Sequence, residues 1–600
     1  MTGVLDPHHD GSEAYVPRGP KALGDVVPVR VRVPAGRDVR SVHIRSLTDA
    51  EPGMAPARLE SRGPHESWWV GEVTVANPVT RYRFLIEEPG TTCWLNAAGY
   101  HDREVSDAAD FRLTAHAPAP DWARAAVVYQ VFPDRFARSG AEHDVPDWAV
   151  PVAWDTPPQG AGREVGRQFY GGDLPGIEQH LDHLQTLGVD VLYLTPVFPG
   201  RSNHRYDAAT FEHVDPLLGG DEALASLSAA VHTRGMRIMG DITTNHTGAG
   251  HEWFERARAD RTGEEAGYYL WTDEAPGYVA WLGHASLPKL NHADAALRAR
   301  MIAGPGSVVG RWLAPPFGLD GWRVDVANMT GRHRDTDLTH EVARTVRATM
   351  TAVRPDALLV SEHFHDASAD LQGDGWHANM NYMGFSRPVW AWLMPPDTTL
   401  RDHGLPFART RRPGGAVAAT MRDFASQVPW QVTEVQWNMV SSHDTARIRT
   451  VVADPRLVEV AAGLMFTYPG TPVVYAGDEI GAEGWNGESG RVPMPWDRRE
   501  DWDLATFEAY RRLVAVRHGS RALRDGGLRW VAAEDDALVF LRETRDERVL
   551  VAAARAPWAG LRLPEGLVEG TPLTLHGPDL GAGGREIPGD GPGIGVWRIA

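Results

Sequence analysis

The stretch that decides the fold is Gly318-Leu319-Asp320-Gly321-Trp322-Arg323-Val324-Asp325-Val326-Ala327-Asn328-Met329. Residues 321–326 have the composition of a short buried strand, and Asp325 stands near its carboxyl end. Because side chains alternate along a strand, Arg323 lies on the same face as Asp325. A neighbouring arginine favours the ionised carboxylate, which suits an anion that attacks or stabilises a cationic carbon. A structural ion pair is the alternative interpretation, and polar clusters at other strand ends favour the chemical one.

The segments around this strand alternate short apolar runs with amphipathic helices. Two predicted helices, 174–187 and 223–234, are followed by Gly188 and Gly235, and glycine commonly ends a helix. The predicted strands are residues 126–132, 189–194, 236–242, 321–326, 357–361, 378–382, 435–439 and 471–475. Eight strands alternating with helices over about 400 residues predict a (β/α)8 TIM barrel.

Other patterns flank the predicted barrel. Short alternating runs at 26–33, 39–47, 68–75 and 80–86, with turn-rich segments such as 51–56 between them, predict an N-terminal antiparallel β-sandwich. Strands at 528–531, 537–541 and 549–553 predict a C-terminal β-domain. A segment too long for a simple loop follows the third barrel strand and predicts a small inserted domain. The predicted domains are 1–121, 122–520 with the insertion at about 247–293, and 521–600.

Composition restricts the partners. A net charge of -19 over 600 residues argues against nucleic acid and anionic membranes, since both favour basic patches. Cys93 is the single cysteine, so no intrachain disulfide can form. Residues 1–25 lack the basic-then-apolar pattern of a signal peptide, and no uncharged apolar run approaches the length of a membrane span. We therefore expect a cytoplasmic protein without membrane or nucleic-acid partners.

Polar clusters follow the predicted strands at the edge where such a barrel collects its active site. The clusters are Asp134-Arg135-Phe136 after the first strand, 241–246 at the third, Arg323 and Asp325 at the fourth, Glu362 after the fifth, and His443-Asp444 after the seventh. Three carboxylates from three strands should therefore meet. Like charges in one site raise one another's pKa, a cost that suits glycoside cleavage.

Glycoside cleavage needs one carboxyl protonated, to assist the leaving oxygen, and another ionised, to attack the anomeric carbon. Asp325, with Arg323 beside it, is the predicted nucleophile. Glu362 has no cationic neighbour in the sequence and is the predicted general acid and then base. Asp444 is predicted to hold the sugar hydroxyls.

Segments 241–246, 321–328, 360–362 and 441–444 resemble the four sequence regions of the α-amylase superfamily, glycoside hydrolase family 13. The resemblance implies Asp325 as nucleophile, Glu362 as acid/base and Asp444 as transition-state stabiliser. It implies retention of configuration, with the first two carboxyls about 5–5.5 Å apart. It also implies a set of substrate-binding residues: His246, Arg323 and His443, with Tyr206 as stacking platform and Asp207 beside it. Arg447 either reaches the substrate or forms a salt bridge.

Three further segments, 170–174, 287–291 and 326–328, resemble the neopullulanase, cyclomaltodextrinase and maltogenic amylase group. The resemblance implies hydrolysis of maltooligosaccharides, cyclodextrins or pullulan, with possible transglycosylation and no required cofactor. The predicted N-terminal domain is then similar to a starch-binding module that can build a homodimer. Alternatives within the family are an α-glucosidase, a glucanotransferase or a trehalose-synthase-type transferase. A catalytically inactive carbohydrate-binding relative is the alternative of another class.

Three positions depart from the pattern of that group. Met329 stands where the group has Glu, which leaves the preference for α-1,4 or α-1,6 bonds open. Phe364 stands where the group tends to carry Trp, on the predicted acceptor side. Arg138 replaces the usual Asn ligand of a calcium ion and would repel a cation, so only Asp144 and Asp173 stay as candidate calcium ligands.

Overall fold

The computed structural model describes residues 6–142, 144–401 and 405–600. Its centre is a parallel sheet in the order β18-β17-β14-β13-β12-β9-β20-β19. The strands are β9 (Val128–Val131), β12 (Val191–Leu194), β13 (Arg237–Thr243), β14 (Gly321–Asp325), β17 (Leu358–Ser361), β18 (Ala378–Asn379), β19 (Trp437–Met439) and β20 (Thr471–Tyr475). A parallel bridge between Met380 and Trp437 joins the two edges. The predicted barrel is confirmed.

Side chains of the barrel strands alternate between two cores. Val128 belongs to the cluster inside the barrel with Met239 and Val360, whereas Tyr129 belongs to the cluster under the surrounding helices. This period of two follows from strand geometry, and it explains why nearly every strand residue is apolar. The polar side chains inside the strands, such as Gln130, Asp241 and Arg323, belong to the middle or the carboxyl-terminal halves of β9, β13 and β14.

One predicted barrel helix is divided in two. The segment 174–187 forms two helices, α3 (Leu174–Gln179) and α4 (Leu181–Leu187), because His180 leaves the helical conformation, and α4 ends at Gly188 with φ 87°. Outside the insertion, the other helices longer than six residues in the described part of the barrel are α5 (Gly220–Thr233), α7 (Ala295–Met301), α9 (Thr339–Val353), α10 (Arg387–Leu393), α11 (Gly414–Ser426), α14 (Pro455–Thr467) and α16 (Leu504–His518). The short helices are α1 (Trp122–Ala125), α2 (Pro133–Phe136), α8 (Val308–Arg311), α12 (Trp430–Thr433), α13 (Ile448–Val452), α15 (Gly487–Gly490) and α17 (Arg521–Asp525).

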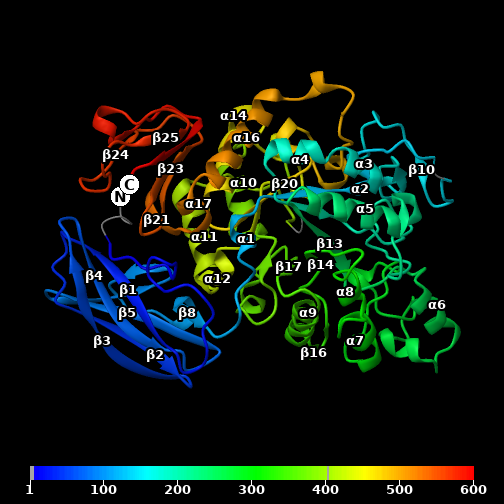
Figure 1. The fold of residues 1–600 in the computed structure, drawn as a ribbon, viewed down its shortest axis with the longest axis horizontal. Helices are drawn as coiled ribbons and strands as arrows, with labels where there is room; N and C mark the ends of the chain where they lie inside the picture. Colours follow the sequence, from blue (N-terminus) through cyan, green and yellow to red (C-terminus); the bar gives the residue numbers. More distant parts are fainter. Residues whose placement is uncertain (1–5, 143, 402–404) are drawn as a thin grey trace.

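The insertion after β13 folds around aromatic side chains. Helix α6 (Glu252–Ala259) places Phe254 against Tyr269 and Trp271. The segment returns to the barrel rim where the Leu290 N–H donates to the Asn245 carbonyl (2.9 Å). In Figure 1 it lies at the far side of the barrel from both sheets that flank the barrel.

The N-terminal sheet is antiparallel, and the turn predicted at 51–56 is wrong. Those residues begin β3 (Glu51–Arg62), which pairs with β2 through its first half and with β4 through its second. Almost all of β3 is exposed, so no apolar alternation marked it, and pairing with two neighbours overrides its weak strand propensity. The remaining strands are β1 (Val26–Pro34), β2 (Ser41–Thr48), β4 (Glu66–Thr74), β5 (Val79–Glu88), β6 (Thr91–Asn96), β7 (Gly99–His101) and β8 (Phe111–Thr114).

The C-terminal sheet has the order β21-β22-β23-β27-β25, with bounds Gly527–Ala533, Ala537–Glu543, Arg548–Ala554, Gly593–Arg598 and Leu573–His576. It lies on the same side of the barrel as the N-terminal sheet (Figure 1). A buried ion pair between Arg32 and Glu543 (2.7 Å) joins the two sheets. Within the described residues, no helix has the length and apolarity needed to span a membrane.

Candidate active site

The three predicted carboxylates face one cavity of about 1120 Å³ at the carboxyl ends of the barrel strands. Asp325 ends β14, Glu362 follows β17 directly, and Asp444 lies in the loop after β19. Parallel strands of a closed barrel present their carboxyl ends at one rim, so residues far apart in the chain meet there. Tyr206, Asp207 and His246 line the same cavity.

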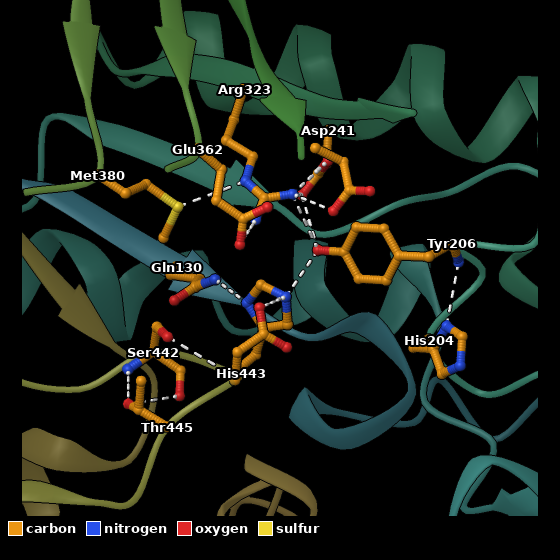
Figure 2. A network of polar contacts seen from close by, with 12 residues as sticks. Gln130, His204, Tyr206, Asp241, Arg323, Glu362, Met380, Ser442, His443 and Thr445 are labelled. Atoms are coloured by element: carbon orange, nitrogen blue, oxygen red, sulfur yellow. Dashed lines mark hydrogen bonds and ion pairs between the residues drawn. The ribbon is translucent and has the colours of Figure 1, made fainter. Parts of the chain in front are cut away.

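Arg323 is the centre of the polar network that Figure 2 shows. Its Nη1 lies 2.9 Å from Asp325 Oδ1 and 3.1 Å from Asp241 Oδ1, and its Nη2 lies 2.7 Å from Glu362 Oε1. The sequence analysis pairs Arg323 with Asp325 alone, whereas in the structure Arg323 also pairs with Asp241 and Glu362. The guanidinium is fully buried, so these carboxylates are its charge partners.

The pKa values of Asp325 and Glu362 are both raised. Burial and the charge of Glu362 raise the pKa of Asp325 well above its ordinary range, against the lowering effect of Arg323. Burial likewise raises the pKa of Glu362, although Arg323 opposes it. Because ionisation of one carboxyl disfavours ionisation of the other, the pair is arranged to retain one proton. A pair with one acid and one anion is what double displacement requires.

The backbone directly after Asp325 is strained. Val326, which follows Asp325, has a φ of 37°, a conformation rare for a β-branched residue. Its N–H donates to Glu362 Oε2 (2.9 Å). Strain of this kind persists only where the surroundings impose it, and it often marks a functional site.

Asp444 has the opposite electrostatic environment. Burial alone would raise its pKa, but His443 (3.0 Å) and Arg491 (3.2 Å) hold the pKa below the ordinary range. Gln130 Nε2 lies 2.6 Å from His443 Nδ1, and the Tyr206 hydroxyl lies 2.7 Å from His443 Nε2. Asp444 is therefore an anion at neutral pH.

The predicted substrate-binding residues divide into two layers. His246 lines the cavity, its Nε2 has no partner among the described residues, and burial with the charge of Lys289 lowers its pKa to about 3. Tyr206 also lines the cavity, with its ring stacked on His443 (5.5 Å between centroids). Arg323 and His443 are fully buried behind the carboxylates and do not line the cavity.

Asp207 and Arg447 use their charged groups in contacts with other residues of the protein. Asp207 lines the cavity, yet its carboxylate accepts from the Ser202 hydroxyl and from the Arg201 N–H. Arg447 is buried outside the cavity lining and pairs with Asp478 (2.9 Å). Of the two alternatives for Arg447, the structure shows the salt bridge.

Comparison with known proteins agrees with this geometry. The family described as alpha amylase, catalytic domain, matches residues 130–510. The chain belongs to the alpha-amylase family. A cyclomaltodextrinase of Geobacillus thermopakistaniensis (strain MAS1) is 32% identical over 509 residues, which cover 82% of this chain and 80% of that protein. Neopullulanase 2 of Thermoactinomyces vulgaris is 30% identical over 547 residues, covering 87% and 86%. A solved cyclomaltodextrinase structure aligns with a TM-score of 0.74 at 25% identity over 99% of both chains.

The resemblance read from the four sequence segments is thus confirmed, and the protein is an alpha-amylase family hydrolase. The resemblance raises the possibility of a bound calcium ion, but the residues present do not fit one. Arg138 Nε donates to the Tyr170 carbonyl (2.5 Å), which places a cationic side chain where a metal would need oxygen ligands. Asp173 accepts from the Gly176 N–H (2.7 Å) and from the N–H (3.0 Å) and hydroxyl (2.5 Å) of Ser139. Asp144 is exposed.

Several residues of this family site escaped the sequence analysis. Arg491 lies 47 positions after Asp444, and no short motif links the two. Lys289 lies in the segment 287–291 without a predicted role; its Nζ donates to Asn245 Oδ1 and to the Met329 carbonyl (2.8 Å) and so fixes the insertion to the rim. Trp281 and Trp485 line the cavity, and a chain with 22 tryptophans gave no signal to single them out.

Proposed function

We propose that this enzyme hydrolyses α-glucosidic bonds of maltooligosaccharides, cyclodextrins or pullulan with retention of configuration. The observation that carries the proposal is the pair Asp325 and Glu362, which face one cavity and are bound by neighbouring nitrogens of one guanidinium. Similarity to proteins named cyclomaltodextrinase and neopullulanase supports the substrate class.

The proposed reaction has two displacements. In the first, Asp325 attacks the anomeric carbon while Glu362 gives its proton to the glycosidic oxygen, and the leaving sugar departs with that proton. In the second, Glu362 takes a proton from water, whose oxygen attacks the same carbon and releases Asp325. Arg323 contacts both carboxylates, so it stabilises Asp325 as the anion that attacks and Glu362 as the anion left after its proton has gone to the glycosidic oxygen.

Asp444 is the proposed stabiliser of the transition state. Its lowered pKa keeps it anionic beside a ring that gains positive charge, and its remaining exposure (28% of the side chain) leaves it open to sugar hydroxyls. His246, neutral and with an unpaired ring nitrogen, is a proposed hydrogen-bond partner of the same sugar. Tyr206 is the proposed stacking platform.

Transglycosylation is a second candidate outcome, favoured by apolar side chains in the lining of the cavity. Phe364, Met329 and Trp281 face the cavity together with polar groups. An acceptor sugar held there can attack the intermediate in place of water.

The homodimer through the N-terminal sheet and the cytoplasmic location remain predictions. The cytoplasmic location is supported by the single cysteine, Cys93.

A substrate panel tests the proposal directly. The purified protein is incubated with β-cyclodextrin, pullulan, soluble starch, maltotriose and trehalose, and the products are separated by chromatography. We expect short maltooligosaccharides from at least one of the first four. Longer oligosaccharides would show transfer, and turnover of trehalose alone would favour the trehalose-synthase alternative. A folded protein that cleaves no α-glucoside would refute the enzymatic proposal.

The substitution Asp325→Asn tests the nucleophile. Because the amide cannot attack, we expect kcat/KM to fall by at least about 10³-fold. Stability should be unchanged or higher, since the substitution removes a buried charge whose pKa is already raised. Asp356→Asn, the same change at a surface ion pair with Arg237, is the control. Retained activity in Asp325→Asn would refute the assignment.

A further inference from the structure

Trp485 presents its indole to the active-site cavity. The residue is 54% exposed and lines the cavity in the loop after β20. Large aromatic side chains of folded proteins are mostly buried, so an exposed indole at a ligand cavity needs a reason. If other residues hold one face of the indole in place, the exposed part of the ring can stack on a sugar.

The ring is held in place from behind. Gly160 lies so close that an added Cβ would stand 2.3 Å from the indole. Asn486 Nδ2 donates to the Gly160 carbonyl (2.7 Å), and the Trp485 N–H donates to Ser489 Oγ (2.9 Å). The backbone of Gly160 therefore covers one part of the ring and fixes its orientation, while the exposed part faces the cavity.

The loop that carries Trp485 is pressed against Asp444. A Cβ added to Gly487 would stand 2.7 Å from the backbone of Asp444, so only glycine permits this approach. Arg491, at the end of the same loop, lies 3.2 Å from Asp444 Oδ1. The position of the indole is thus fixed relative to the carboxylate that holds the sugar.

Glu362 belongs to another part of the rim, because β17, which it follows, is separated from β20 by β18 and β19 on one side of the closed sheet and by four strands on the other. Phe364, two residues after Glu362, lines the cavity and stacks on Tyr382 with ring centroids 4.0 Å apart. As the proton donor, Glu362 must face the glycosidic oxygen, so the leaving group lies on its flank. The sugars that precede the cleaved bond then extend toward Asp444 and the loop of Trp485.

We infer that Trp485 stacks on the glucose unit that precedes the one attacked by Asp325. The inference rests on the proposed function and names the donor: the enzyme takes maltosyl or longer donors in preference to single glucosyl units. His204, Arg167 and Glu488 line the same cavity and offer polar groups to the hydroxyls of that second unit. Burial and the charge of Arg491 lower the pKa of the His204 ring to about 3, so it is neutral there.

Two chromogenic substrates with the same leaving group test this inference. p-Nitrophenyl α-maltoside and p-nitrophenyl α-glucoside differ by one donor sugar, so the ratio of their kcat/KM values isolates the second donor position. We expect Trp485→Ala to lower this ratio by about tenfold, as loss of one stacked ring predicts. Trp485→Phe keeps a ring and should keep the ratio within about threefold. Trp94→Ala, the same substitution in the N-terminal sheet, should leave the ratio unchanged.

Other outcomes are distinguishable. An unchanged ratio in Trp485→Ala overturns the inference. An equal loss on both substrates together with a lower Tm shows a structural role only and also overturns it. If Trp485→Ala does not fold, Asp325→Asn and the double variant Asp325→Asn/Trp485→Phe are titrated with maltose and glucose by calorimetry. If both proteins bind maltose no more tightly than glucose, the inference is wrong. A wild-type protein inactive on both substrates would instead count against the proposed function.

Discussion

Arg323 shows at the residue scale how one cation organises three anions. It contacts Asp241, Asp325 and Glu362, and Asp241 also accepts from the hydroxyls of Tyr193 (2.6 Å) and Tyr206 (2.9 Å). Asp241 is thereby occupied as a supporting carboxylate. One positive charge cannot compensate three negative ones, so a proton must stay with Asp325 or Glu362 at neutral pH.

The substitution Glu362→Gln tests this shared proton. The wild-type rate should rise with pH as Asp325 ionises and fall as Glu362 loses its proton, so kcat/KM follows a bell. Because Glu362 is still protonated while Asp325 ionises, its replacement by the neutral Gln should leave the acidic limb close to its wild-type position. The alkaline limb should disappear. On unactivated maltooligosaccharides the rate should fall by about 10²–10⁴-fold.

The measurement uses p-nitrophenyl α-maltoside, whose leaving group needs little acid assistance. Glu341→Gln on the outer helix α9 is the matched control and should keep the wild-type profile. An alkaline limb that persists in Glu362→Gln would contradict the assignment of that limb to Glu362.

Arg138 joins two elements of the barrel rim. Its guanidinium links the loop after α2 to the segment before α3 through the Tyr170 and Val152 carbonyls, and it lies 5.0 Å from the Trp154 ring. Backbones of these segments also approach closely, since an added Cβ on Gly176 would stand 2.5 Å from the Ala137 carbonyl. The positive charge of Arg138 therefore lies where a bound metal ion would require oxygen ligands.

We predict that the stability of this rim does not depend on calcium. Excess EDTA or added calcium should change Tm by less than about 1 °C, whereas Arg138→Ala should cost about 1–3 kcal/mol through unpaired carbonyls. Arg498→Ala, at a surface ion pair with Asp501, is the control. Calorimetry checks both, and an EDTA-induced loss of Tm that calcium restores would contradict the prediction.

Prediction from the sequence succeeded where one local rule decided the outcome. Buried barrel strands read as apolar runs, and polar residues at their ends had to meet at one rim, so Asp325, Glu362 and Asp444 were identifiable. The strand β3 could not be identified because its exposed residues carry no periodic pattern. The contact of Arg323 with Glu362 depends on the register of β14 and β17, and the contact of Arg491 with Asp444 depends on a long loop. Spacing in the chain fixes neither.

At the scale of the whole molecule, the two terminal sheets are joined by buried charges. Glu543 accepts from Arg32 (2.7 Å), Arg529 (2.9 Å) and Arg548 (2.7 Å), and Asp10 Oδ2 accepts from the Leu528 N–H (2.8 Å). Burial alone would raise the pKa of Glu543, but these arginines hold it well below the ordinary range. Breaking such a group leaves unpaired buried cations.

We predict that Glu543→Gln destabilises the protein by about 3–5 kcal/mol. Because the folded-state pKa is lowered, the wild-type contribution is present above the ordinary glutamate pKa and is lost as the pH falls below it. The difference in Tm between wild type and variant should therefore shrink toward acid. Glu60→Gln removes a surface partner of Arg30 at a similar distance (2.8 Å) and should cost at most about 1 kcal/mol. Equal losses of stability from the two substitutions would show that the buried ion pairs of Glu543 stabilise the protein no more than a surface ion pair does.

The same junction sets a constraint on biosynthesis. Arg32 and Glu543 are separated by 511 positions in the chain. At a synthesis rate of roughly 5–20 residues per second, the arginine waits about 25–100 s for its partner to leave the ribosome. Until then Arg32 lacks the carboxylate of Glu543 and is paired with Glu66 of its own sheet (3.4 Å). The residues around Glu543 thus complete a contact of the earlier sheet, and termination of translation between the two positions leaves Arg32 without this partner.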